Sequence, residues 1–276
     1  MFKRMVGTAA QLTAVALMLL AATAHASGSA PGRVLRVVGT SIEVVDGEGV
    51  RRAGQALAGT ELTLGDGPDA PHLRVLTVLS DGTRGVLLHE IEALDASTGQ
   101  WTNICDADRD NRKLVLFIEG HDLPDGSQVR VPGQLSLTCT AGVQGKCLRA
   151  GYFPWDDAHG PGSGVAMFQT CTRMFRADYC GDGIGWTRKG MAIDLFDVHG
   201  IQQAETPATM PLEAAWGPGG ALCVHHTRVR ERGPLAALLA QCPRLAAVAN
   251  GAACTEDTGK RLPGALLFNR SVDTSD

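Results

Sequence analysis

The chain has 276 residues, of which 44% are hydrophobic and 20% charged, with a formal net charge of −4. This length fits one large domain or two modest ones, and the ordinary globular composition excludes wholesale disorder. The negative charge and the lack of a dense basic run exclude a typical nucleic-acid-binding protein, so we expect no nucleic-acid partner. The 34 glycines favour turns and short strands over a bundle of long helices.

Residues 1–26 have the pattern of a secretory signal peptide. A cationic start, Met1–Arg4, precedes an apolar run over Leu12–Ala22, and small residues follow at Ala24-His25-Ala26. The apolar run is too short for a membrane span. We therefore expect cleavage after Ala26 and a secreted or periplasmic mature protein with no membrane span.

All eight cysteines follow the expected cleavage point. An even number of cysteines in an exported chain indicates disulfide bonds, and the absence of any Cys-x-x-Cys pair argues against a zinc site. The sequence does not determine the pairing, although it favours Cys105 with Cys139 and Cys242 with Cys254. The expected disulfide cysteines are Cys105, Cys139, Cys147, Cys171, Cys180, Cys223, Cys242 and Cys254.

Residues 27–140 are predicted to be rich in β-structure. Short β-branched or apolar runs alternate with turn dipeptides such as Asp81-Gly82 and Asp125-Gly126, a spacing typical of antiparallel hairpins. No alternation of strands with helices occurs, so a dinucleotide-binding fold is not supported, and no cofactor is expected. The expected strands include 34–38, 41–45, 73–79, 86–88, 113–118 and 134–138.

Residues 141–276 are predicted to form a cysteine-rich α+β region. Ser163 is the expected N-cap of an amphipathic helix over about 164–177, with apolar residues at three- and four-residue steps. A strand over 191–196 and a short helix over 235–241, started by Pro234, follow. The predicted fold class is therefore α+β: an N-terminal antiparallel β region, then a disulfide-rich region with one amphipathic helix and a short C-terminal helix. The two regions are either separate domains or parts of one core.

Asp106, Asp108 and Asp110 have the alternate spacing of a calcium-binding loop. However, the twelfth position is Phe117 instead of a bidentate Glu, and Arg109 and neighbouring basic residues offset the negative charge. We expect a solvated, internally paired loop and no metal.

Known catalytic motifs are absent from the sequence. Ser163 has glycines directly beside it, but a hydrolase nucleophile elbow needs them two residues away, where Pro161 and Val165 stand. The densest polar cluster surrounds Asp178, which would become a general acid if apolar neighbours raised its pKa. The other interpretation is a structural network of Arg176, Asp178, Tyr179 and Asp182, in which Arg176 keeps Asp178 ionised. His226 is a further candidate base.

The segment Phe175-Arg176-Ala177-Asp178-Tyr179-Cys180-Gly181-Asp182-Gly183 resembles the signature of the bacterial ADYC domain family. Gly145-Lys146-Cys147, Gly151-Tyr152 and Cys242-Pro243 also fit this family, and the similarity is strongest from Cys139 to Pro243. The resemblance implies an exported bacterial protein with a cysteine-rich domain of unestablished activity, and it supplies no catalytic residues.

Two functional hypotheses follow. The favoured one is a non-catalytic binding or structural module whose partner is a protein or a surface ligand. The alternative is a secreted hydrolase-type enzyme that uses Asp178, Asp182 or His226 in a cleft between the two halves. That alternative requires two of these side chains to converge in an open pocket.

Overall fold

A computed structural model describes residues 34–65, 67, 69–83 and 85–272. The expected signal peptide, residues 1–26, lies outside the described residues. Within these ranges, every helix is too short or too polar to cross a membrane.

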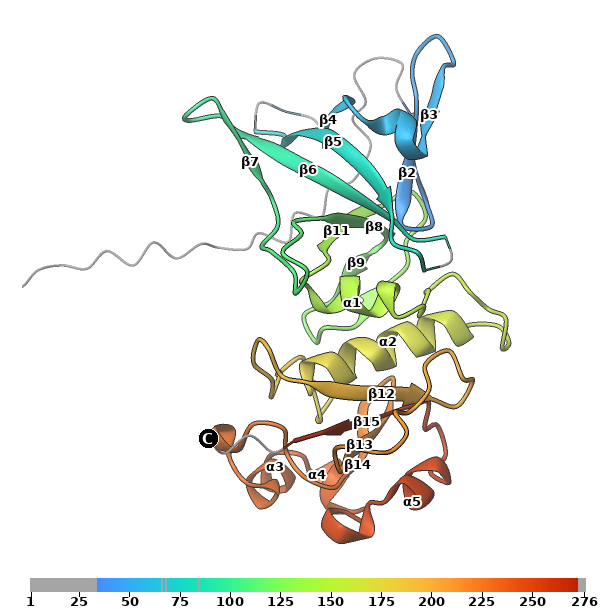
Figure 1. Cartoon of the computed structure of the whole chain (residues 1–276), viewed down its shortest axis with the longest axis vertical. Coiled ribbons are helices and arrows are strands. Elements are labelled where there is room, and N and C mark those ends of the chain that lie inside the picture. The colour runs from blue at the N-terminus through green and yellow to red at the C-terminus, as the bar shows by residue number, and fades with distance from the viewer. Residues whose placement is uncertain (1–33, 66, 68, 84, 273–276) are drawn as a thin grey trace, which may run out of the picture.

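The order of the elements along the chain matches a β-rich first half and a mixed second half (Figure 1). The strands are β1 Val34–Val38, β2 Ser41–Val45, β3 Arg51–Ala53, β4 Glu61–Thr63, β5 His72–Ser80, β6 Leu87–Asp95, β7 Gln100–Asn103, β8 Val115–Glu119, β9 His121–Asp122, β10 Gln128–Val129, β11 Leu135–Cys139, β12 Ile193–Asp197, β13 Leu212–Gly217, β14 Gly220–Val224 and β15 Leu267–Ser271. The α-helices are α1 Val143–Arg149, α2 Ser163–Arg176, α3 Leu235–Gln241, α4 Pro243–Ala246 and α5 Glu256–Lys260, and short 3-10 turns cover Gly54–Leu57, Arg230–Arg232 and Gly251–Ala253. The fold is α+β, as the sequence predicts.

The strand pairs of the first half are antiparallel. Strands β1, β2 and β3 form one sheet, and β11-β8-β6-β5-β4 form the path of a larger sheet in which β7 also pairs with β6. An apolar core between these sheets includes Ile42, Val75, Ile91 and Phe117, all fully buried. Strand β8 is buried on both faces, which explains its continuous apolar sequence.

Helices α1 and α2 lie between the β-rich part and a second sheet (Figure 1). Helix α1 contacts β11, while α2 packs on β13 and β15. One apolar cluster contains Leu88 and Leu116 from the first half together with Leu148, Phe168 and Trp216 from the second. The helices therefore connect the two sheets through continuous apolar packing.

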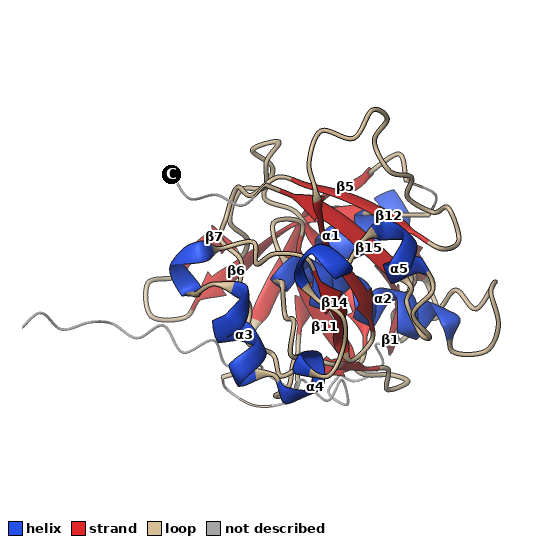
Figure 2. Ribbon diagram, turned by 90° about the horizontal axis from the view of Figure 1, so that it is seen from below, coloured by secondary structure: helices blue, strands red, loops and turns tan. Residues whose placement is uncertain are grey.

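The second sheet has the order β12-β15-β13-β14, and its pairs are antiparallel. Figure 2 shows the short helices at this end of the molecule, where α4 contacts β14 and α5 contacts β13. All six residues of β13 are buried, so its polar member, Glu213, needs an internal partner.

One helix boundary differs from the prediction, at the start of α2. Ser163 is the first residue of α2, whose N-cap is Gly162 with φ of 77°, and the buried Ser163 hydroxyl has no hydrogen-bond partner among the described residues. Helix α3 covers the predicted residues 235–241, and Pro243 begins a further helix, α4, at a position that suits proline because the first helical N–H has no acceptor.

Candidate functional site

The polar cluster of the sequence analysis begins where α2 ends. Ala177 adopts a left-handed conformation with φ of 50° and reverses the chain. The N–H of Ala177 donates to the carbonyl oxygen of Met174 at 3.0 Å. The N–H of Asp178 donates to the carbonyl oxygen of Arg173 at 2.9 Å. These bonds satisfy carbonyls that would otherwise be orphaned at a helix C-terminus. The reversal places Asp178 beside the last turns of its own helix.

The Asp178 carboxylate is fully buried and surrounded by donors. Oδ1 accepts the N–H groups of Gly181 and Asp182 at 2.9 and 3.1 Å. Oδ2 accepts the N–H of Gly183 at 3.0 Å and Nη1 of Arg173 at 2.5 Å. Four donors therefore occupy lone pairs of the two carboxyl oxygens, so this side chain organises the following loop.

The cation that pairs with Asp178 is Arg173, not Arg176 as the sequence analysis proposed. Arg173 lies five residues before Asp178, and the left-handed residue between them folds the carboxylate back over that turn of the helix. Arg173 is 3% exposed and also donates to the backbone carbonyl of Asp125 at 2.5 Å. It therefore holds the β9–β10 hairpin as well as the Asp178 loop.

Tyr179 belongs to a second buried network. Its hydroxyl donates to Glu213 at 2.9 Å and accepts the N–H of Arg228 at 2.9 Å. The guanidinium of Arg228 donates to the Glu213 carboxylate from Nε at 2.8 Å and from Nη2 at 3.0 Å. The side-chain amide of Asn269 donates to the same carboxylate at 2.7 Å. Burial favours the neutral acid, but the charge and hydrogen bonds of Arg228 keep the pKa of Glu213 below its usual value. Burial also raises the pKa of Tyr179, so its hydroxyl stays protonated.

The structure pairs all eight cysteines. Cys105 bonds to Cys139, in agreement with the sequence. The expected bond between Cys242 and Cys254 is wrong, because the packing of α3 and α4 brings Cys242 to Cys180 and places Cys254 beside Cys223 on β14. The bonds are Cys105–Cys139, Cys147–Cys171, Cys180–Cys242 and Cys223–Cys254, with Cα atoms 5.5–5.8 Å apart.

Arg244 of α4, two residues after Cys242, also binds the backbone of the signature segment. It donates to the carbonyls of Ala221 and Tyr179 at 2.6 and 3.0 Å. Gly181 has φ of 75°, and a Cβ there would lie 2.1 Å from the carbonyl oxygen of Gly219. Glycine is thus required for both conformation and close approach. Each residue from Ala177 to Cys180 therefore makes a contact or adopts a conformation that the fold requires.

The other catalytic candidates also have local partners. Asp182 is exposed, and its Oδ1 accepts the N–H of Ile184 at 2.9 Å. Nε2 of His226 lies 3.2 Å from the hydroxyl of Ser271 on β15. The backbone N–H of Asp182 donates to the Asp178 carboxylate, which is a turn interaction and not a pairing of two catalytic side chains.

The acidic loop after β7 is paired with arginines. Asp106 is exposed, whereas the Asp108 carboxylate is 3% exposed and lies 3.4 Å from both Arg112 and Arg149. Asp110 lies 2.9 Å from Arg112. Burial opposes ionisation of Asp108, but the Arg112 N–H and charge help to lower its pKa. Among the described residues, no group of three or more metal-ligating side chains forms here or elsewhere.

A polar group that the sequence analysis missed surrounds α1. Asp122 of β9 accepts the Gln144 amide at 2.5 Å. Partial desolvation by the surrounding protein raises the pKa of Asp122, although the Gln144 bond and the positive charge of Arg176 oppose this shift. The sequence gives no motif for this contact, because its partners come from β9, α1 and the end of α2.

Lys146 lies on the same helix as Gln144. Its ammonium is 5.9 Å from the centre of the Phe175 ring. Desolvation lowers the pKa of Lys146, and the positive charges of Arg228 and Lys189 lower it further. We call Lys146, Arg176 and Lys189 the α1 cation group. Within the described chain, none of the three forms an ion pair with a carboxylate. Perturbed carboxyl and amino groups on neighbouring elements are typical of functional sites, although structural networks also produce them.

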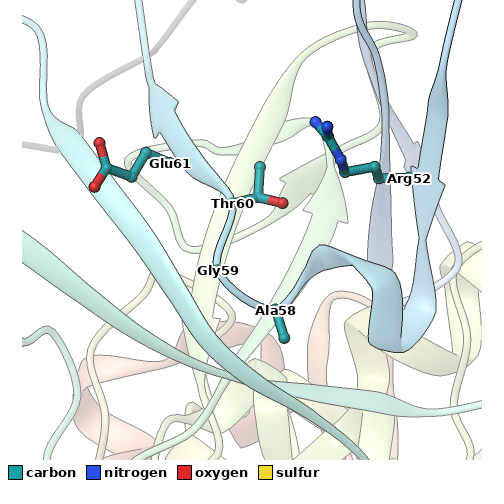
Figure 3. Close-up of a pocket in the computed structure, with 5 residues that line it drawn as sticks. All are labelled: Arg52, Ala58, Gly59, Thr60 and Glu61. Atoms are coloured by element: carbon teal, nitrogen blue, oxygen red, sulfur yellow. The ribbon is translucent and has the colours of Figure 1, made fainter.

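One surface pocket lies far from these residues in the fold, beside β3 and β4 (Figure 3). It has a volume of about 470 Å³ and is lined by Arg52, Ala58, Gly59, Thr60 and Glu61. Figure 3 shows the Arg52 and Glu61 side chains on opposite sides of the Ala58–Thr60 segment. None of Asp178, Asp182 and His226 lines it.

Comparison with known proteins gives one finding. The model of the ADYC domain matches residues 54–230, so the match begins in the β-rich half and ends before Cys242. This range is broader on the N-terminal side than the segment with the strongest sequence resemblance. No curated protein and no solved structure matches the chain. Because the family model covers more than half of the sequence and includes the signature at Ala177–Cys180, the chain belongs to the ADYC domain family.

Proposed function

We propose that this chain is an exported protein that acts as a binding or structural module and not as an enzyme. One observation carries the proposal: the side chains of the family signature are all engaged in contacts that hold the fold together. Asp178 bonds to four donors, Tyr179 joins a buried ion pair, and Cys180 is bonded to Cys242. A signature with a catalytic role would be expected to leave at least one polar atom directed into a cleft.

Export is supported by two independent features. The first 26 residues have the charge and hydropathy pattern of a signal peptide. All eight cysteines are in disulfide bonds, which persist in oxidising compartments such as the periplasm or the extracellular space. Fractionation of cells that express the full chain, with mass measurement of the exported product, tests this point. A product that keeps residues 1–26 and stays in the cytosol contradicts it.

The α1 cation group is the feature from which we infer that the ligand is an anion. The Lys146 ammonium lies near the Phe175 ring and is repelled by the charge of Lys189, and an anion bound beside these two lysines would relieve that repulsion. A carboxylate or phosphate group on a partner surface has the matching chemistry. Replacing Lys146 and Lys189 by Gln should abolish binding of such a partner. Replacing Arg109 and Arg52, two cations elsewhere on the chain, should leave it unchanged.

Acid–base chemistry is the second candidate function. It is favoured by the raised pKa of Asp122 and the lowered pKa of Lys146, since opposite shifts assign an acid and a base in many enzymes. A hydrolytic activity that is lost in Asp122→Asn, with unchanged unfolding free energy, would replace the binding proposal. The hydrolase built on Asp178, Asp182 and His226 has no such support.

The architectural role of the signature has a direct test. Asp178→Asn replaces an acceptor oxygen by a donor and leaves Arg173 buried without its counter-ion, so it should lower the unfolding free energy by about 2–4 kcal/mol. The matched variant Asp182→Asn, at an exposed turn four residues later, should change it by less than about 0.5 kcal/mol. Urea unfolding measures both. Equal stability of the two variants would remove the main support for the proposal.

A further inference from the structure

Two exposed histidines, forty positions apart in the sequence, face each other. His159 lies in the loop between α1 and α2, and His199 lies in the turn that follows β12. Their ring centroids are 3.7 Å apart, and the ring planes differ by 4°. Among the described residues, no hydrogen bond engages a ring nitrogen of either side chain. Both imidazoles are therefore available to a ligand.

The turn that carries His199 is held by the carboxylate of Asp197. Oδ1 accepts the N–H groups of His199 and Ile201 at 2.8 and 3.2 Å. Oδ2 accepts the N–H of Gln202 at 2.6 Å and the hydroxyl of Tyr152 at 2.9 Å. Four donors on one carboxylate restrict the turn and also tie it to the segment that precedes His159.

The loop that carries His159 is restricted in a similar way. The side chain of Asp156 accepts the N–H of Ala158 at 3.1 Å. The backbone carbonyl of Asp157 accepts the N–H of Gly160 at 3.0 Å, and its side chain accepts that of Gly164 at 3.3 Å. The His159 loop is therefore fixed to the first turn of α2. Two separate frameworks bring the imidazoles together before any ligand is present, which lowers the entropic cost of binding.

The chemistry of two adjacent imidazoles suits a divalent transition metal. Imidazole nitrogens bind Zn²⁺ at about 2.0–2.1 Å, so two nitrogens on one tetrahedral ion are about 3.3 Å apart. The ring centroids, 3.7 Å apart, already lie within a few tenths of an ångström of this separation. Because the rings are exposed, they can rotate so that one nitrogen of each points at a shared ion. The two loops thus hold the imidazoles close enough to share one ion once the side chains have rotated.

We propose that His159 and His199 bind one Zn²⁺ or Cu²⁺ ion, with water in the remaining coordination positions. No third His, Cys, Asp or Glu completes a cluster within the described part of the chain, so the site is open to an exogenous donor. This site is independent of the α1 cation group and of the proposed function.

A second pair of histidines in the described part of the chain serves as the internal comparison. His225 and His226 are adjacent, but their rings are perpendicular with centroids 5.8 Å apart. Nδ1 of His225 is 3.1 Å from the Cys254 carbonyl, and Nε2 of His226 contacts Ser271. Their hydrogen bonds and orientation make them the poorer pair of ligands.

Titration calorimetry with ZnCl₂ on the untagged protein tests the proposal, with CuCl₂ as a second probe. We expect one ion per chain. His159→Gln and His199→Gln should each weaken binding by roughly tenfold or more, because loss of even an outer-shell partner of a metal ligand costs that much. The control variants His72→Gln and His225→Gln should bind as the unmodified protein does. Unchanged affinity in both His159→Gln and His199→Gln, or a loss in His225→Gln, overturns the proposal, and circular dichroism confirms that each variant is folded.

Discussion

The β-rich half and the cysteine-rich half bury polar groups in different ways. Among the described residues of the first half, the covered carboxylates of Asp81 and Asp108 lie at its edge beside the partly exposed Arg112 and Arg149, and the fully buried titratable side chain is the neutral His89. The second half buries three ion pairs, which are Arg173–Asp178, Arg228–Glu213 and Arg270–Asp194.

This difference indicates which changes should destabilise each half. A buried ion pair contributes little net stability compared with apolar packing, yet the removal of one partner is costly because the other charge stays buried. A buried neutral histidine has the opposite weakness, since it must acquire a proton that the apolar core does not tolerate. The second half should therefore be sensitive to single charge deletions, and the first half to acid.

Glu213→Gln should produce the largest loss. The substitution keeps the shape of the side chain but leaves the guanidinium of Arg228 fully buried without a counter-ion. We expect the unfolding free energy at pH 7 to fall by about 3–5 kcal/mol, measured by urea unfolding. The exposed pair Arg188–Glu231 has a similar distance of 2.9 Å, and Glu231→Gln should cost less than about 1 kcal/mol. Equal losses in the two variants would show that burial does not distinguish these pairs.

Two disulfide deletions compare the halves directly. Cys105–Cys139 and Cys223–Cys254 span 34 and 31 residues, one bond in each half. Because the loops are nearly equal, restriction of the unfolded chain predicts a similar loss of about 3–4 kcal/mol when either pair is replaced by Ala. Thermal or urea unfolding of the two double variants provides the measurement. A much greater loss for Cys223–Cys254 would show that packing of its buried sulfurs, and not chain entropy, dominates.

The pH dependence of stability tests the first half. Burial lowers the pKa of His89 from 6.5 to about 4, although the hydrogen bond to the Val115 carbonyl opposes the shift. The unfolded chain therefore binds a proton at this residue between pH 6.5 and 4, whereas the native protein does not. The resulting stability is present above pH 6.5 and is lost as the pH falls towards 4, by roughly 3 kcal/mol.

His89→Gln removes this titration, and urea unfolding at pH 4.5 and 7 should show a smaller difference than in the unmodified protein. His72→Gln, at an exposed position on β5, should keep the full difference. The same pH dependence in both variants would assign the acid sensitivity to groups outside the first core.

The sequence predicted the elements better than their contacts. The alternation and Asp-Gly turns of the first half predicted most strands, and the apolar stripe predicted α2, because these signals are local. Cys105–Cys139 was also predictable, since the two cysteines flank a single β region. The pairing of Cys242 was not, because it depends on how α3 and α4 pack against the signature loop.

The candidate site shows the same limit. The importance of the Asp178 segment was visible, but Arg173 as its partner depends on the left-handed conformation of Ala177, which no local pattern revealed. Glu213 did carry a signal, as the single acid in the apolar run Leu212–Trp216. Its partner Arg228 and the pairing of His159 with His199 arise only from tertiary approach.

The cross-links of Cys180 and Cys223 set a practical limit on how short this protein can be made. Both partners, Cys242 and Cys254, lie beyond the last residue of the family match. A fragment trimmed at position 230 would carry two unmatched thiols and would be prone to intermolecular oxidation. An autonomous folding unit therefore extends at least through Cys254, well past the four-residue signature that identifies the family.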